Sequence, residues 1–130
     1  NVVVAAFLRP GSDPDHILRL VLQGDLEIAL DERVLREYRE VLSRPKFALP
    51  AEAIEAVLER LRAIALHAPA TPQRVSLPDP DDAPFLEVAL ASNADVLITG
   101  NARHYPKAAC RGVPVLRPRQ FVALMARRAR

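Results

Sequence analysis

Three aspartates stand close together in the segment LPDPDDAPF, which covers residues 77–85. Asp79, Asp81 and Asp82 precede an apolar run, and carboxylates at such a position either cap a helix or gather around a cation. An α-helix turns by about 100° per residue, which places Asp82 on the same side as Phe85. An ionised acid on this inward side needs hydrogen-bond donors or a cation. Taken alone, the segment leaves both capping and metal binding open.

Oxygen-bearing side chains occur at two further places where they could join this segment. Glu37 lies at the edge of the apolar stripe of VLREYREVL, where a salt bridge with Arg33 is the alternative interpretation. Thr99 and Asn101 follow the apolar run VLI, where a plain turn is the alternative. Carboxylates that meet at one site repel each other unless a divalent cation joins them. Such oxygen ligands suit Mg²⁺ or Mn²⁺ rather than zinc.

The elements that must position these residues follow from apolar periodicity and from capping residues. Helices are predicted over residues 13–23, 32–44, 51–64, 82–92 and 119–129. Strands are predicted over residues 25–30, 95–100 and 113–116. Short strands that alternate with helices predict an α/β fold with a parallel sheet flanked by helices on both faces. In such sheets ligands bind at the carboxyl ends of the strands, which is where the acids are expected to converge.

The length of the chain, 130 residues, fits one domain over residues 1–130. The single cysteine, Cys110, excludes an internal disulfide, and no cysteine and histidine spacing is typical of zinc sites. No apolar run approaches the roughly 20 residues that span a bilayer, and no leader resembles a signal peptide. We therefore expect a cytoplasmic protein that does not bind membranes.

Charge is divided unevenly along the chain. Residues 1–100 contain all 16 acids and ten basic residues, a net charge of −6, whereas residues 101–130 contain eight basic residues and no acid. A basic segment of this kind attracts phosphate backbones, although a solvated arginine-rich tail has the same composition. Both interpretations stay open on charge alone.

Four segments, taken in order, resemble the PIN-domain family, in the branch that contains toxins of toxin–antitoxin systems. They are VLREYREVLSRPKF, DPDDAPFLEVALASNADVLITGN, ARHYP and VPVLRPRQFV. The likeness covers nearly the whole chain. It implies a metal-dependent endoribonuclease with a three-layer fold, a Mg²⁺ or Mn²⁺ cofactor, RNA as substrate, a cognate antitoxin as partner and a homo-oligomeric state.

The resemblance also implies roles for individual residues. Glu37 matches the helix glutamate of the family, and Asp82 matches a later aspartate with Asp79 as its neighbour, so these three are the implied catalytic residues. The implied metal ligands are Asp82, Glu37, Asp79 and Asn101, although many relatives carry aspartate at the last position. The implied RNA contacts are Thr99, Arg103, His104, Arg117 and Arg119.

The start of the chain departs from the family pattern. VVVAAF, residues 2–7, reads as a strand from its β-branched composition alone, whereas the resemblance makes it the start of a helix. The family's first strand and first aspartate would then precede residue 1. If that strand is central, as the family implies, residues 1–130 would be poorly stable or would rely on a neighbour to complete the sheet. A binding module without turnover is the alternative function. An unrelated phosphate-binding protein is disfavoured, because the four glycines are scattered.

Overall fold

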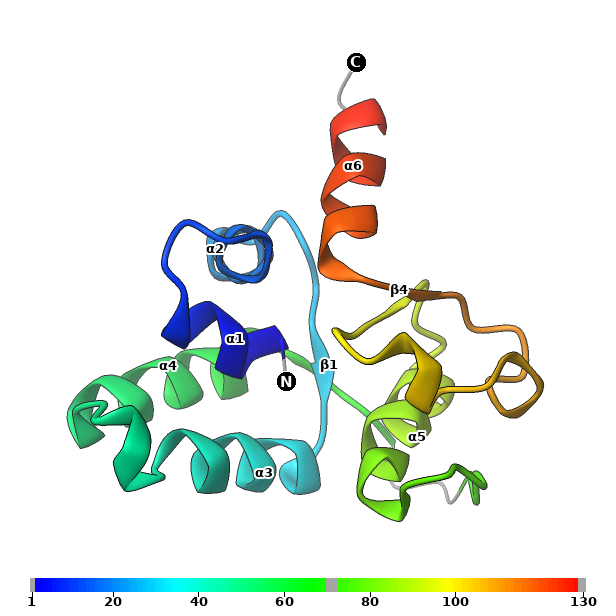
Figure 1. Ribbon diagram of the computed structural model, residues 1–130, viewed down its shortest axis with the longest axis horizontal. Coiled ribbons are helices and arrows are strands. Elements are labelled where there is room, and N and C mark those ends of the chain that lie inside the picture. The colour runs from blue at the N-terminus through cyan, green and yellow to red at the C-terminus, as the bar shows by residue number, and fades with distance from the viewer. Residues whose placement is uncertain (1, 70–72, 129–130) are drawn as a thin grey trace.

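The computed structural model describes residues 2–69 and 73–128, and it has an α/β arrangement of helices and short strands (Figure 1). The α-helices are α1 (Val2–Leu8), α2 (Asp13–Gln23), α3 (Glu32–Leu42), α4 (Ala51–Ile64), α5 (Ala83–Ala91) and α6 (Pro118–Arg128). The strands are β1 (Ala29–Leu30), β2 (Leu66–His67), β3 (Leu97–Ile98) and β4 (Val115–Leu116). Short 3₁₀ turns include η2 (Pro80–Asp82) and η3 (Ala102–His104). No helix within the described ranges combines the length and apolar character needed to cross a membrane.

Helices α2 and α4 and the start of α3 lie where the sequence predicts them, whereas α3 ends two residues earlier and α5 is one residue shorter at each end. The Ser12 hydroxyl accepts a hydrogen bond from the Asp15 N–H at the start of α2 (3.4 Å). Gly24 ends this helix in the left-handed region at φ 89°, where a residue without a side chain is favoured. Asp31 caps α3 by accepting from the Val34 N–H at 3.1 Å. These predictions are confirmed because capping residues satisfy backbone groups that a helix end leaves free.

Residues 2–8 form helix α1, so the helix prediction is confirmed and the interpretation of VVVAAF as a strand is wrong. Val3, Val4 and Ala6 are buried, and the helix lies against α2 and α3. The packing of one helical side decides the conformation here, because tertiary contacts override the weak β preference of valine.

The strands form two separate parallel pairs. β1 pairs with β2 and β3 pairs with β4, and no bridge joins the pairs in the part of the chain that the structure describes. The prediction of parallel strands is therefore confirmed, but the expected single sheet is interrupted between β1 and β3. β2 was not predicted, and β1 and β3 are shorter than the apolar runs that contain them.

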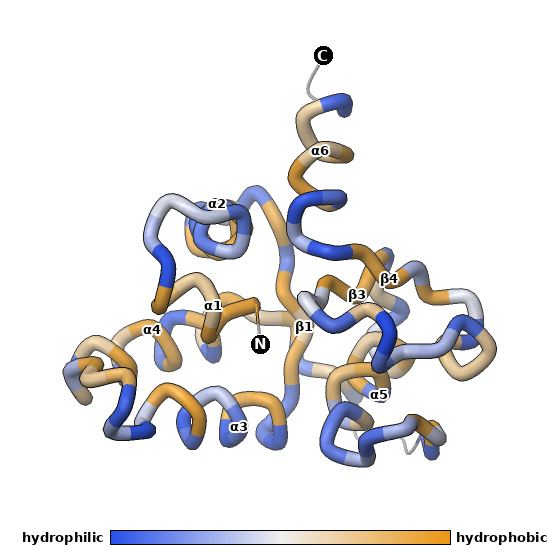
Figure 2. Tube along the Cα trace, viewed as in Figure 1, coloured by the Kyte–Doolittle hydropathy of each residue, from blue (hydrophilic) through white to orange (hydrophobic). Residues whose placement is uncertain are grey.

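Two clusters of apolar side chains lie on either side of this interruption. The larger cluster joins α1, α2, α3, α4 and β1, and Leu35, Leu58 and Leu61 are almost fully enclosed in it. The smaller cluster surrounds Leu86, Tyr105 and Cys110. Figure 2 shows the alternation of apolar and polar residues along the helices, which is typical of helices that bury one side.

Candidate functional site

A pocket of about 250 Å³ lies at the carboxyl end of β3, between α3 and α5. Its polar lining consists of Glu37, Asp79, Asp81, Asp82, Thr99 and Asn101 together with the hydroxyl-bearing side chains of Tyr38 and Tyr105. Val4, Val41, Phe85, Leu97 and Ile98 supply its apolar walls. The fold thus brings together four acids and one amide from a stretch of sequence that runs from Glu37 to Asn101.

Asp82 is an acid of the pocket that has a buried carboxylate oxygen. Its side chain is 22 % exposed, and its Oδ2 atom is buried and accepts no hydrogen bond from any described residue. His104 Nδ1 lies 3.2 Å from this oxygen, a distance that makes an ion pair when the imidazole is protonated, but no hydrogen bond joins the two atoms. Asp82 also makes no capping bond to α5. The predicted inward orientation of Asp82 is therefore confirmed.

Capping in this segment belongs to Asp79. Its Oδ1 atom accepts a hydrogen bond from the Asp81 N–H at 2.9 Å and so begins η2. Asp81 could have capped the helix as well, but its side chain forms no capping bond in the described part of the chain. Asp81 is exposed and lines the pocket as a further carboxylate that was not among the predicted metal ligands.

Glu37 is half-buried and reaches the pocket from α3. Arg33, its expected partner, pairs instead with Glu87 (2.6 Å) and Asp31 (2.8 Å). Hydrogen bonding to Glu87 raises the pKa of the Arg33 guanidinium, and Asp31 adds to this effect. Since Glu87 belongs to α5, Arg33 ties the start of α3 to the helix that carries Asp82.

Two buried tyrosines line the pocket. The Tyr38 ring packs against Phe85 with centroids 6.2 Å apart, and burial raises the pKa of its hydroxyl well above the ordinary value. The Tyr105 hydroxyl donates a long hydrogen bond to the backbone carbonyl of Asp82 (3.4 Å). Burial, followed by the charge of Asp82, raises the pKa of Tyr105, so both phenols are neutral donors at physiological pH.

The turn after β3 positions Thr99, a predicted RNA contact, and Asn101, the last of the predicted metal ligands. Thr99 is buried, and its Oγ1 atom accepts a hydrogen bond from the Asn101 N–H at 3.1 Å. This bond shapes the turn and directs the exposed Asn101 beyond the end of the strand. Thr99 therefore lies inside the pocket, whereas a role in contacting RNA remains a prediction.

The predicted RNA contacts fall into two groups. Arg103, Arg117 and Arg119 are exposed, and Arg117 follows β4 as directly as Thr99 follows β3. Because the carboxyl ends of parallel strands meet at one edge, Arg117 lies on the same edge as Asn101. His104 is only partly exposed and faces Asp82. Apolar periodicity does not predict this contact, because His104 lies in the short 3₁₀ turn that follows β3.

The side chains that line the pocket include oxygen atoms that could coordinate a divalent cation. No three acidic, histidine or cysteine side chains among the described residues converge tightly enough to enclose a metal by themselves. Mg²⁺, however, keeps several waters and binds through one or two carboxylates. A buried Asp82 oxygen without a hydrogen bond, beside the carboxylate of Glu37 and the amide of Asn101, fits that coordination.

Comparison with known proteins identifies the family. No curated protein and no solved structure gives a significant match to the chain. The family model described as PIN domain matches residues 1–103, which include α1 to α5, β3 and every acid of the pocket. The chain therefore belongs to the PIN-domain family, whose members are generally nucleases.

Proposed function

We propose that this protein is a metal-dependent endoribonuclease and the toxin of a toxin–antitoxin pair. The observation that carries the proposal is the buried, unbonded Oδ2 atom of Asp82 in a pocket that also contains Glu37, Asp79 and Asn101. PIN nucleases act on RNA and typically use divalent metal ions. A carboxylate that is withdrawn from water without a donor is costly, and a cation would remove that cost.

In this proposal Asp82 and Glu37 bind Mg²⁺ or Mn²⁺ directly, while Asp79 and Asn101 orient water. The metal would supply a more acidic water and stabilise negative charge on the phosphate and the leaving oxygen. The neutral hydroxyl of Tyr105 holds the first turn of α5 through the Asp82 carbonyl. His104 lies against Asp82 and limits the directions in which its carboxylate can turn.

RNA would approach along the edge that carries the arginines. Arg103, Arg117 and Arg119 are exposed and would neutralise backbone phosphates, with Thr99 and His104 nearer the scissile bond. Phosphate contacts give affinity, whereas exposed bases of single-stranded loops give sequence preference. The basic character of residues 101–130 fits a role in binding phosphates, because these residues include eight arginines and lysines and no acid.

The proposal also covers the fold and the partners. Residues 1–130 would act as a single domain with a three-layer fold. The protein would work in the cytoplasm as a homo-oligomer, and a segment of the cognate antitoxin would silence it by covering the acidic pocket.

A binding module without turnover is the second candidate. Asn101 stands where many relatives carry aspartate, and this substitution removes one negative charge from the pocket. Such a protein would bind RNA or antitoxin through the same surface but would not cleave RNA.

The deciding experiment compares the unaltered protein with Asp82→Asn and with Asp25→Asn, an exposed loop position away from the pocket. Titration calorimetry with Mn²⁺ should show binding that Asp82→Asn weakens at least about tenfold, since even outer-shell changes at metal sites have effects of this size. A labelled RNA should be cleaved by the unaltered protein and by Asp25→Asn only.

Each outcome has a separate meaning. Mn²⁺ binding without RNA cleavage would favour the binding module. Equal Mn²⁺ affinity in all three proteins would overturn the assignment of Asp82 as a ligand, and cleavage by Asp82→Asn would overturn its catalytic role.

A further inference from the structure

Residues 73–79 contain no helix or strand and lead directly to Asp79 of the acidic pocket, and we call them the strap. Val75 and Leu77 of the strap pack against the smaller apolar cluster, and Asp79 begins η2. Because Asp79 is the last residue of the strap, the contacts that hold the strap also determine where the Asp79 carboxylate lies.

Arg111 binds the start of the strap through two nitrogen atoms of its guanidinium. Nη1 donates a hydrogen bond to the backbone carbonyl of Gln73 at 2.9 Å, and Nη2 donates to the backbone carbonyl of Arg74 at 3.1 Å. A planar guanidinium that donates to two successive carbonyls restricts both the distance and the orientation of the segment that it binds. Arg111 therefore holds the strap from a distant part of the sequence.

The backbone on both sides of this contact adopts a conformation that residues with side chains disfavour. Arg74 has a φ of 46° and Arg111 has a φ of 50°, which lie in the left-handed region. A residue with a side chain stays in this region only where the surrounding contacts hold it there. The two angles therefore indicate that the contact between Arg111 and the strap is a specific part of the fold.

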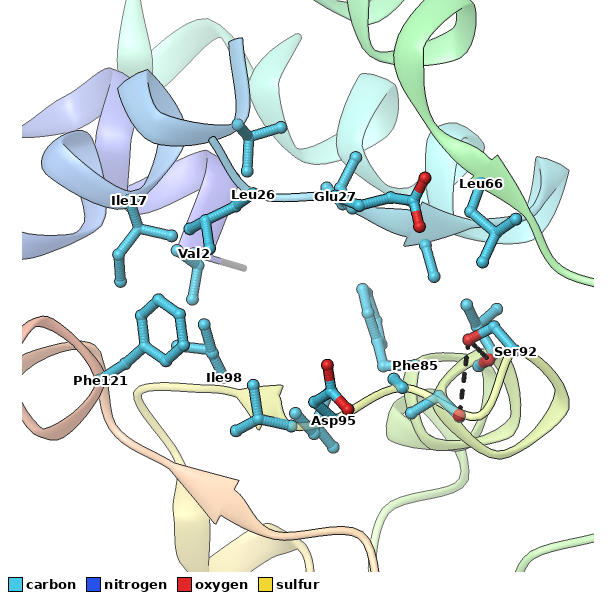
Figure 3. Close-up of a pocket in the computed structure, with 18 of the residues that line it drawn as sticks. Val2, Ile17, Leu26, Glu27, Leu66, Phe85, Ser92, Asp95, Ile98 and Phe121 are labelled. Carbon is cyan, nitrogen blue, oxygen red and sulfur yellow. Dashed lines mark hydrogen bonds between the residues drawn. The ribbon is translucent and has the colours of Figure 1, made fainter. Parts of the chain in front are cut away.

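A second contact fastens the strap to α5. Phe85 and Ser92 of this helix line a cavity of about 500 Å³ (Figure 3), whereas Glu87 lies on another side of the helix. Glu87 Oε2 accepts a long hydrogen bond from the Val75 N–H (3.5 Å), and Glu87 Oε1 accepts a hydrogen bond from Arg33 (2.6 Å). The strap is thus held at three successive residues, at the carbonyls of residues 73 and 74 and at the N–H of residue 75.

We propose that Arg111 is a positioning residue for Asp79. Its guanidinium holds the strap in the arrangement that presents the Asp79 carboxylate to the acidic pocket, so this arginine supports the pocket instead of binding RNA. Arg111 lies outside residues 1–103, which match the PIN-domain model. The inference rests on the proposed nuclease, in which Asp79 orients water at the metal, but one of its tests is made without metal.

The direction of the change in Mn²⁺ affinity separates positioning from a simple effect of charge. Arg111→Gln removes a positive charge from the surroundings of an acidic pocket, which on charge alone should strengthen the binding of a cation. Displacement of Asp79 should instead weaken Mn²⁺ binding by about tenfold, the lower end of the effect of outer-shell changes at metal sites. Lys107→Gln removes an equal charge from an exposed residue of the same segment and should not weaken Mn²⁺ binding. Titration calorimetry measures both variants.

Hydrogen exchange measured by NMR without metal reports the position of Asp79. The Asp79 Oδ1 atom accepts a hydrogen bond from the Asp81 N–H at 2.9 Å, so this N–H should exchange faster when the strap is released. We expect exchange about threefold to tenfold faster in Arg111→Gln, as the loss of one hydrogen bond predicts, and unchanged exchange in Lys107→Gln. Arg111→Gly should behave like Arg111→Gln, although glycine suits the positive φ of this position, because both variants lack the guanidinium.

A double-mutant cycle tests whether Arg111 acts through Asp79. In the Asp79→Asn protein, Arg111→Gln should have no further effect on Mn²⁺ affinity, because the carboxylate that it positions is already lost. Additive effects, equal or tighter Mn²⁺ binding in Arg111→Gln, or unchanged exchange of the Asp81 N–H would each overturn the proposal. If the unaltered protein binds no Mn²⁺ while the Asp81 N–H exchanges faster in Arg111→Gln, the proposed metal nuclease fails and the positioning of Asp79 by Arg111 stands.

Discussion

At the residue scale, Asp82 is defined by its inward orientation and by its contact with His104. Helical periodicity predicted that it faces inward, because every residue of a helix has a fixed direction relative to its neighbours. Its contact with His104 was not predictable, since the two residues lie 22 positions apart in sequence, with β3 between them. The capping role of Asp79, rather than Asp81, depended on the 3₁₀ turn, and periodicity does not reveal such a turn.

Tyr105 gives a prediction on pH. Its pKa is raised above 10.0 in the folded protein, mainly by burial and next by Asp82. A raised pKa gives stability that is present below the ordinary value and is lost as pH rises above it. The free energy of unfolding should therefore fall above about pH 10, with Tyr105 contributing up to about 1.4 kcal/mol per pH unit.

Urea unfolding of the unaltered protein and Tyr105→Phe between pH 8 and 11 measures this contribution. The variant should lose stability less steeply, although Tyr38 and Cys110, whose pKa values are also raised by burial, still contribute in both proteins. Parallel curves would show that the Tyr105 hydroxyl ionises as easily in the folded state as in the unfolded state.

At the scale of elements, the helices were predictable and the strands were less so. Ser12, Gly24 and Asp31 mark helix ends through local hydrogen bonds and backbone conformation, which act within a few residues. β2 consists of Leu66 and His67 and has no recognisable pattern. A strand of two residues exists because a partner lies beside it, and that information is not local.

The end of α2 supplies a prediction for an element. Gly24 has a φ of 89° and no atom within 4 Å of an added Cβ, so Gly24→Ala meets only backbone strain. We expect the variant to lose about 1–2 kcal/mol of unfolding free energy. Gly100→Ala is the matched control, because Gly100 has equal space but no positive φ.

Urea denaturation measures both variants. Gly100→Ala should stay within about 0.5 kcal/mol of the unaltered protein. Equal losses in the two variants would mean that helix termination at Gly24 is not what the substitution disturbs.

At the scale of the whole molecule, the exposed arginines and the acids of the pocket come from different parts of the sequence. Arg117 and Arg119 are exposed beside β4, outside the residues that match the family, whereas the acids lie within the matched part. The sequence predicted this separation of charge, since composition alone reveals it. It did not reveal that the sheet is interrupted, because the gap depends on how β1 and β3 are placed by their covering helices.

The exposed arginines Arg103, Arg117 and Arg119 give a prediction on RNA binding. Arg117→Gln should weaken the binding of single-stranded RNA uniformly across sequences and reduce the slope of log affinity against log salt by about 0.7. Arg60→Gln, at an exposed position of α4, should leave the slope unchanged. Filter binding at several salt concentrations measures both. An unchanged slope in Arg117→Gln would remove this residue from the RNA surface.

The ion pair between Arg33 and Glu87 has a consequence for the acids of the pocket. Glu37 belongs to α3 and Asp82 precedes α5, and α5 packs against α3 and against both β1 and β3. The ion pair that joins α3 to α5 therefore braces the two carboxylates relative to each other. An architectural contact without any reactive group would in this way help to set the size of ion that the pocket accepts.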